Sequence, residues 1–237
     1  MARRRGPKAK APLAEAVKGR APKIRRALLR WWRQNARSYP WRERGRTPYE
    51  VLVAEMLLKR TTATAAARIY EGFLEKFPSV GALDEARLRK VETTLRSVGL
   101  QRQRAKGFKA MARYLTAEEE GEIPTDVKRL MRIPHVGSYA TAAVASFALG
   151  ERAAVVDSNV ERILRRVFED HVRELDSAGA LRDTAGQLLP RDDRSFNYAM
   201  LDLGAAVCRY GQPRCWECPL QAACDYNLAG RRARTDI

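Results

Sequence analysis

The chain has 237 residues, 45% of them hydrophobic, which is enough to bury a sizeable core. Its 45 Lys and Arg against 28 Asp and Glu give a net charge of +17. This charge favours nucleic acid as a partner over an anionic membrane surface, because binding phosphates releases counterions. No run of eighteen or more apolar residues predicts a spanning helix, and no apolar stretch after the basic N-terminus indicates secretion. We therefore expect a protein of the cytoplasm, associated with its DNA, and no membrane partner.

The chain begins with a basic segment, residues 1–26, that is rich in Ala and Pro. We expect it to lack regular structure and to be either a solvated tail or a nonspecific DNA-binding arm. Apolar residues at helical spacing follow in IRRALLRWWRQNA. A loop over residues 38–48 then leads into the segment 49–77. This segment is too long for one ordinary helix. A break is expected near Lys59 to Thr62.

The rest of the chain also has helical spacing, with turn residues between the segments. Predicted helices are residues 83–98 (ending at Gly99), 102–118, 126–133, 139–149, 158–169 (with Ser158 as N-cap), one within 176–193, and 195–211. No internal repeat and no alternating strand pattern is found. The sequence therefore predicts an all-α fold.

All four cysteines lie near the end of the chain in the pattern C-x6-C-x2-C-x5-C. They are Cys208, Cys215, Cys218 and Cys224. In a reducing compartment, clustered cysteines more often bind metal than form disulfides. Four thiolates suit a zinc ion or an iron–sulfur cluster, and chemistry alone leaves both open.

A turn between two predicted helices, IPHVGSYATAAV, runs from Ile133 to Val144. A short helix, a Pro-x-Val-Gly-Ser turn and a second helix can direct backbone N–H groups at one phosphate, aided by the helix dipole. Such a hairpin holds a nucleic-acid backbone without reading sequence. The alternative is a simple corner between two helices.

Asp157 lies eighteen residues beyond Tyr139 and ends the apolar run of VVDSNV. A buried carboxylate is costly unless it is paired or hydrogen-bonded. Asp157 is therefore either the N-cap of the next helix or a catalytic carboxylate that stabilises positive charge or activates water.

Together, the hairpin, Asp157 and the cysteine spacing resemble the endonuclease III superfamily of DNA glycosylases over about residues 27–226. The resemblance implies an all-α, two-domain fold with a C-terminal iron–sulfur cluster loop. A six-helix barrel with the helix–hairpin–helix would span residues 44–151, and residues 27–43 plus 152–237 would form the second domain. The four cysteines would hold a [4Fe–4S] cluster. The implied partner is double-stranded DNA with a mismatched or damaged base, and we expect a monomer.

Two branches of the superfamily are similar to this chain. FNYAMLDLGAAVC, CPLQAAC and the Pro-Trp at residues 40 and 41 resemble the adenine glycosylases. That branch usually has a further C-terminal domain, for which the residues after the cysteines leave no room, and tends to have two glutamines in place of Lys59 and Arg60. EMLLKRTTA, GLQRQRA and Tyr139 are instead similar to archaeal thymine-DNA glycosylases that act on G·T mismatches.

The resemblance also implies catalytic roles. Asp157 would stabilise an oxocarbenium-like sugar and help water attack, and Glu55 would face the flipped base. Glu55 is alternatively an ordinary helix residue. In endonuclease III a lysine matches Tyr139 and forms a Schiff base with the sugar. Because Tyr139 has no amine, weak or no strand cleavage is expected, and its ring would wall in the flipped base or, alternatively, pack as core.

Further residues are candidates for DNA binding. Arg60 would fill the space left by the flipped base or contact the orphan guanine, beside Lys59, while Gln101 and Arg102 would approach the other strand. The hairpin residues expected at a phosphate are His135, Val136, Gly137 and Ser138. The family's turn usually reads Leu-Pro-Gly-Val-Gly, and His135 replaces its first Gly. His tolerates a positive φ better than most residues, so the turn is expected to survive.

These patterns predict a monofunctional base excision repair glycosylase that removes thymine or uracil mispaired with guanine. An adenine glycosylase acting opposite guanine or oxidised guanine, without the usual extra domain, is the first alternative. A DNA-binding relative without catalytic activity is the second.

Overall fold

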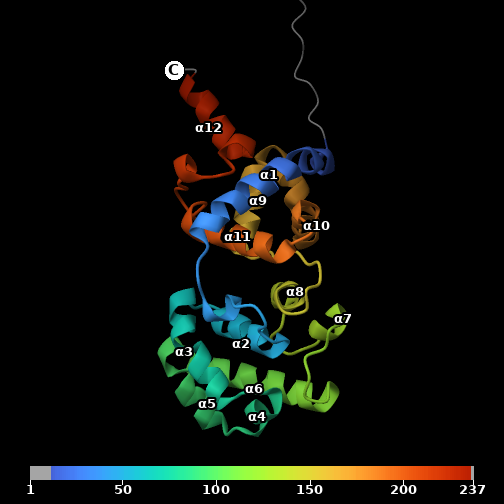
Figure 1. Cartoon of the computed structure of the whole chain (residues 1–237), viewed down its shortest axis with the longest axis vertical. Coiled ribbons are helices and arrows are strands. Elements are labelled where there is room, and N and C mark those ends of the chain that lie inside the picture. Colours follow the sequence, from blue (N-terminus) through green and yellow to red (C-terminus); the bar gives the residue numbers. More distant parts are fainter. Residues whose placement is uncertain (1–11, 236–237) are drawn as a thin grey trace, which may run out of the picture. The chain divides into compact units, whose positions relative to one another are not determined.

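The structure is a computed structural model in which residues 12–235 are described, the last five of them by their backbone alone. Within this range the chain contains helices and no strand, which confirms the predicted all-α class (Figure 1). The α-helices are α1 (Leu13–Asn35), α2 (Pro48–Leu58), α3 (Ala63–Lys76), α4 (Val80–Glu85), α5 (Leu88–Thr94), α6 (Gln101–Glu118), α7 (Val127–Leu130), α8 (Ser138–Phe147), α9 (Ser158–Val167), α10 (Ala178–Leu188), α11 (Asp193–Ala206) and α12 (Asp225–Thr235). In residues 12–235 no helix is long and apolar enough to cross a membrane.

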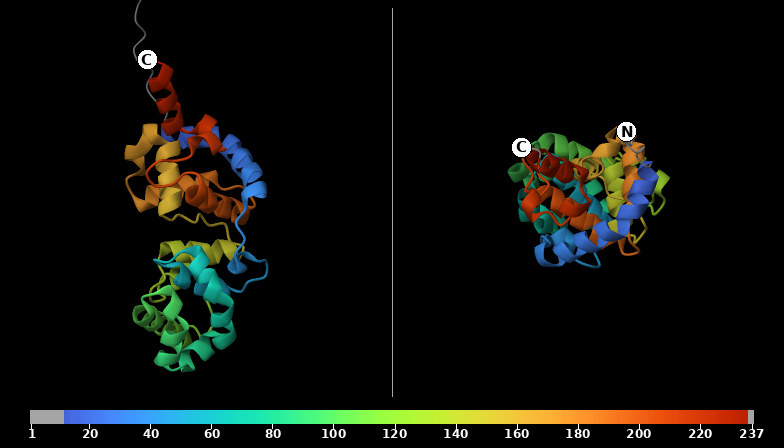
Figure 2. Two further views of the ribbon diagram at one scale, coloured as in Figure 1. Left: turned by 90° about the vertical axis from the view of Figure 1, so that its left-hand side faces the viewer. Right: turned by 90° about the horizontal axis from the view of Figure 1, so that it is seen from above.

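The chain forms two compact units. One is the continuous segment Arg37–Val155, and the other combines the chain up to Ala36 with the chain from Val156 onward. In the continuous unit, α2 packs against α3 and α8, while α6 packs against α4 and α5 (Figure 2). In the other unit, α1 packs against α10 and α11, and α9 against α11.

Helix α1 begins well before the sequence predicted. The expectation of a segment without regular structure is wrong for residues 13–26, and residues 1–11 of that segment lie outside the described part of the chain. The reason is a regular apolar face, whose buried residues are Leu13, Val17, Ala21, Ile24 and Leu28. Their three- and four-residue spacing places them on one side of a helix, where packing on α10 and α11 outweighs the surrounding charge.

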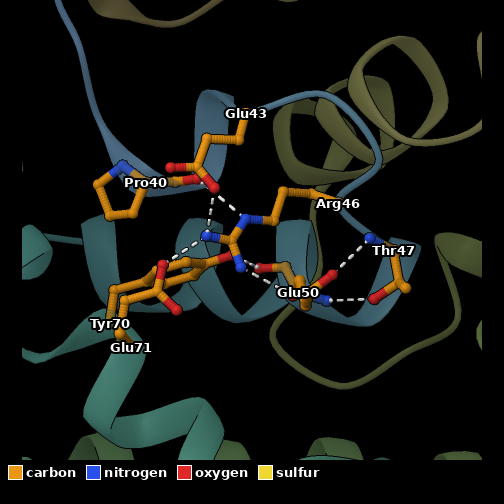
Figure 3. A network of polar contacts seen from close by, with 7 residues as sticks. All are labelled: Pro40, Glu43, Arg46, Thr47, Glu50, Tyr70 and Glu71. Carbon is orange, nitrogen blue, oxygen red and sulfur yellow. Dashed lines mark hydrogen bonds and ion pairs between the residues drawn. The ribbon is translucent and has the colours of Figure 1, made fainter.

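The start of α2 is fixed by a network around Arg46 (Figure 3). Its guanidinium lies 2.8 Å from Glu43, 2.9 Å from Glu50 and against Glu71, and it covers the Tyr70 ring at 5.3 Å. The side chains and backbone N–H groups of Thr47 and Glu50 form a reciprocal capping box. Burial raises the pKa of Glu50, but hydrogen bonds from Thr47 and Arg46 outweigh it and hold that pKa below its usual value. The network sets where α2 begins and so which of its residues face inward.

Two helix boundaries test the sequence patterns. The predicted break near Lys59 is confirmed, because α2 ends at Leu58 and α3 begins at Ala63. The single helix predicted over residues 83–98 is wrong, since α4 and α5 are separated by extended backbone at Ala86 and Arg87. Both short helices pack against α6.

Candidate active site

Glu55 lies on a helix that is buried almost all round. Seven of its neighbours in α2 are buried, and Glu55 itself is only 5% exposed. A buried carboxylate among apolar neighbours is costly unless it is paired or hydrogen-bonded. Lys59 lies one turn further on, at the C-terminal end of α2. Burial lowers the pKa of the Lys59 ammonium, while the charge on Glu55 raises it and the charge on Arg104 lowers it.

The hairpin consists of α7, a turn and α8. Asp126 caps α7, its Oδ1 accepting the Arg129 N–H at 2.9 Å. Inside the turn the Val136 N–H donates to the Ile133 carbonyl, and the Val136 side chain is buried, so this residue supports the turn. Helix α8 starts at Ser138 with no side-chain cap at Gly137. Gly137 has no side chain that could cap the first N–H groups of this helix.

His135 and two other residues adopt an unusual backbone conformation at one cavity. The φ angles are +53° at Arg60, +51° at Leu100 and +66° at His135, three of the four positive values found at non-glycine residues in the described chain. The expected positive φ at His135 is thus confirmed. All three residues line a cavity of about 440 Å³ in the Arg37–Val155 unit. A positive φ places these residues in the left-handed backbone conformation, which is strained for residues other than glycine. Such strain concentrates at functional sites.

The cavity combines an apolar surface with positive charge. Its lining residues are Met56, Lys59, Arg60, Leu100, Gln103, Arg104, Lys106, Gly107, Phe108 and His135. Four of these carry a cationic side chain, and none carries a carboxylate. Such a surface fits nucleic-acid phosphates and stacked bases better than it fits a cationic ligand.

Arg104 joins two of the loops that border the cavity. Its buried guanidinium donates to the carbonyl of Gly99 at 3.0 Å, to those of Met56 and Leu57 at 3.2 and 3.1 Å, and to that of Lys59. These are orphan carbonyls at the end of α2 and a loop carbonyl before α6, so the cation also meets the negative end of a helix dipole. The positions of Arg60 and Leu100 depend on this side chain.

Asp157 is the N-cap of α9, so the prediction of Ser158 as the cap is wrong. Its Oδ1 accepts the backbone N–H groups of Asn159 at 2.9 Å and Val160 at 2.8 Å, and its Oδ2 accepts the Asn159 side-chain amide at 2.7 Å. Asp157 is the cap because its carboxylate reaches both of these N–H groups in the first turn of α9. The carboxylate is thus held in one orientation by three hydrogen bonds.

A chain of polar contacts continues from Asp157. The Asn159 Oδ1 accepts from Arg162 at 2.7 Å, and Arg162 also donates to the carbonyls of Gly204 at 3.0 Å and Cys208 at 2.8 Å. Gly204 is needed at this point of α11, because a Cβ atom there would lie 2.5 Å from the Asn159 Cβ. In the sequence, Gly204 is only a lone glycine within a helical pattern. The fold is needed to show that it contacts Asn159.

The four cysteines line one small cavity. The Arg166 guanidinium donates to the Cys208 Sγ at 3.4 Å. Burial raises the pKa of the Cys218 thiol to about 12 and that of Cys224 to about 11, and the other cysteines add to both. Within the described residues, however, no three His, Cys, Asp or Glu side chains are close enough to hold one metal ion.

Comparison with known proteins places this chain in a family. Residues 53–188, more than half of the chain, match the model described as HhH-GPD superfamily base excision DNA repair protein. The chain belongs to the HhH-GPD superfamily. The thymine-DNA glycosylase of Aeropyrum pernix is 36% identical to this HhH-GPD protein over 88% of the chain and 96% of its own length.

Two further relatives of this HhH-GPD protein carry related names. The thymine/uracil-DNA glycosylase of Methanothermobacter thermautotrophicus is 33% identical over 84% of this chain and 90% of its own. The structure of a thermostable thymine-DNA glycosylase superposes with a TM-score of 0.85 at 31% identity, covering 90% of this chain and 99% of its own. The fold of that glycosylase extends over nearly the whole described chain.

Not every candidate residue of this HhH-GPD protein lies at the cavity. Lys59, Arg60 and His135 line it, whereas Gln101 and Arg102 open α6 without being part of the lining. Seven lining residues were not predicted from the sequence, among them Arg104 and Leu100. Arg104 lies four residues before Phe108, on the buried side of α6, which is a signal the sequence contains. Leu100 has no comparable signal beyond its place after a helix-ending glycine.

Proposed function

We propose that the chain is a monomeric, monofunctional DNA glycosylase that removes thymine or uracil mispaired with guanine in double-stranded DNA, as a step of base excision repair. The observation that carries the proposal is Tyr139 at the second position of the uncapped hairpin helix α8, in a chain that retains Asp157 and Glu55. The similarity to a thymine-DNA and a thymine/uracil-DNA glycosylase supports this choice of base.

The reaction needs the target nucleotide outside the stack, and a mispaired base costs less to extrude. Glu55 accepts the N3–H of the flipped thymine or uracil. As the glycosidic bond breaks, positive charge develops on the sugar, and the carboxylate of Asp157 stabilises it and directs water to it. The products are the free base and an abasic site.

Grip on the DNA comes from the hairpin and the cavity. The uncapped N–H groups at the start of α8 bind one phosphate near the lesion, with the positive end of the helix dipole behind them. Arg60 and Leu100 line the cavity next to the Lys59 and Gly99 carbonyls that Arg104 binds, and they are our candidates for the side chains that fill the space left by an extruded base.

A set of labelled duplexes tests the base. Duplexes with G·T, G·U, adenine opposite oxidised guanine, and thymine glycol are incubated with the full chain and then treated with alkali. We expect strand breaks at G·T and G·U that appear only after alkali. Cleavage confined to adenine opposite guanine or oxidised guanine would identify an adenine glycosylase instead, and no cleavage of any duplex would leave a DNA-binding relative.

Replacing Tyr139 with Lys is expected to add covalent chemistry. The new amine, at the second position of α8, can form a Schiff base with the abasic sugar, so borohydride should trap a protein–DNA adduct. Wild type and the matched control Tyr139→Phe should trap none above background. The readout is a shifted band on a denaturing gel, and equal trapping by wild type and Tyr139→Lys would contradict the role given to this position.

We further propose that the four cysteines hold a [4Fe–4S] cluster. All four cysteines line one cavity, but no three of them lie close enough together to bind a single metal ion. This arrangement supports a cluster over zinc. Tetrahedral zinc with Zn–S bonds near 2.3 Å brings its sulfurs within about 3.8 Å of one another, whereas a cluster binds each thiolate at a different corner. Such a cluster would supply a rigid cross-link of the Cys208–Cys224 loop.

Removing one cysteine tests the cluster. Cys218→Ser is expected to lose the brown colour, the broad absorbance near about 400 nm and most of the roughly four irons per chain. Bound zinc without iron in the wild type would refute the cluster. Because Ser keeps the size of Cys, a fall in iron without general unfolding, followed by circular dichroism, separates lost ligation from lost packing.

A further inference from the structure

We propose that Lys59 is a positioning residue that holds the hairpin turn, instead of a residue that binds DNA directly. Its ammonium Nζ donates a hydrogen bond to the backbone carbonyl of His135, 76 positions away in the sequence. The inference rests on the proposed function in one respect, namely that the hairpin binds a DNA phosphate. Both residues belong to the Arg37–Val155 unit.

The His135 carbonyl has a special need for a donor. With φ at +66° the residue is in the left-handed region, which is strained for a side chain other than glycine. Such a conformation persists only where the surroundings determine it. The next turn residue, Val136, already donates its N–H to Ile133, so the turn itself is closed on that side. The Lys59 hydrogen bond holds the carbonyl of the same peptide, so the two bonds together fix how the peptide after His135 is oriented, and with it the approach to the N–H groups of α8.

Lys59 is itself held in place. Its own carbonyl accepts from Arg104, and the same guanidinium binds the carbonyls of Met56 and Leu57 in the last turn of α2. Arg104, Lys59 and His135 thus form a chain of contacts from α6 through the end of α2 to the hairpin. The Lys59 side chain is exposed overall, but desolvation at its amine lowers the pKa of the amine, which is consistent with an Nζ turned toward protein atoms.

A second packing contact joins the same elements. A Cβ atom added to Gly107 would lie 3.5 Å from both the His135 ring and the Met56 side chain, so these groups meet over the glycine. The turn is consequently supported through its ring and through its carbonyl. Since the ring contact is apolar and lacks direction, the Lys59 hydrogen bond is the directional contact between the end of α2 and this peptide.

Two substitutions in the full chain separate positioning from direct binding. Lys59→Met keeps most of the stem and loses the donor and the charge, whereas Lys59→Gln loses the charge but keeps an N–H donor, one bond closer to the backbone than the lysine Nζ. Lys106→Met is the matched control, because Lys106 is an exposed cation lining the same cavity. The probe is a duplex with a tetrahydrofuran abasic analogue opposite guanine, and Kd is measured at several salt concentrations.

If Lys59 positions the turn, Lys59→Met should weaken binding about tenfold, with an unchanged slope of log Kd against log salt. Lys59→Gln should recover most of that affinity. If Lys59 instead binds a phosphate, both variants should be equally weak and the slope should fall by about 0.9, which overturns the proposal. An unchanged Kd for Lys59→Met overturns it as well. The slope for Lys106→Met calibrates the loss of one exposed charge at this cavity.

This test is independent of base excision. The abasic analogue has no base to remove, so a wild type that binds it without excising thymine refutes the proposed function and leaves the Lys59 test intact. Thermal unfolding of each variant is followed in parallel. A binding defect at a temperature where Lys59→Met is fully folded, together with rescue by Gln, is a result that a merely stabilising role would not produce.

Discussion

Asp157→Asn is expected to slow thymine excision from a G·T duplex by at least about 1000-fold, because the variant loses the negative charge that stabilises the cationic sugar. Asn remains a good N-cap and can still accept N–H groups at the start of α9. The fold and the binding of an abasic duplex should therefore change little. Single-turnover excision with excess protein gives the rate, and titration with the abasic duplex gives the affinity.

Asp157→Ala provides the contrast. It removes both the charge and the cap, so it should be as inactive as Asp157→Asn and also less stable by about 1 kcal/mol. An Asp157→Asn variant that excises thymine within tenfold of the wild-type rate would remove Asp157 from the mechanism. Loss of activity together with loss of DNA binding would indicate a structural role only.

Gly204→Ala is expected to destabilise the protein by about 2 to 3 kcal/mol, because the added methyl group overpacks the contact between α11 and α9. The new Cβ would lie 2.5 Å from the Cβ of Asn159 and 3.3 Å from its Cα and carbonyl carbon. Backbone atoms cannot move aside as a flexible side-chain end can. Since the Asn159 amide binds Asp157, excision should fall as well.

Gly72→Ala is the matched control, since Gly72 lies in α3 with no atom within 4 Å of an added Cβ. There Ala should stabilise the helix by about 0.5 to 1 kcal/mol. Thermal unfolding should show Gly204→Ala about 5 to 10 °C below wild type and Gly72→Ala at or slightly above it. Equal melting temperatures for all three would mean that α9 yields freely at Asn159.

Local patterns predicted most helices but not all of the residues at which they begin and end. Apolar spacing located α6, α9 and α11, and the stop at Gly99 is matched by its φ of +71°. The beginning of α1 was missed because charge and Pro22 obscured an apolar face that was present in the sequence. The final helix α12 was not anticipated. A prediction of local structure weighs neighbours in sequence, whereas α1 is stabilised by helices far along the chain.

The candidate site shows the same division. The cysteine spacing is a local pattern and pointed to one site, and the structure lines one cavity with all four. In contrast, Lys59 was predicted only as a DNA-binding residue, and Arg104 was not predicted among the 45 Lys and Arg. Their roles depend on carbonyls at the end of α2 and in the hairpin, which come together through tertiary packing. No property of the residues themselves announces a backbone acceptor so far away in sequence.

The order of helices also affects how the chain is made. Helix α1 leaves the ribosome before its partners α10 and α11, which begin only at Ala178 and Asp193, so at least 142 residues (36–177) separate it from them. At about 5 to 20 residues per second, α1 waits roughly 7 to 30 s with its apolar face uncovered. The segment Arg37–Val155 can complete its own contacts within that interval. Synthesis therefore passes through a state in which the middle of the chain is folded and its first helix still needs protection.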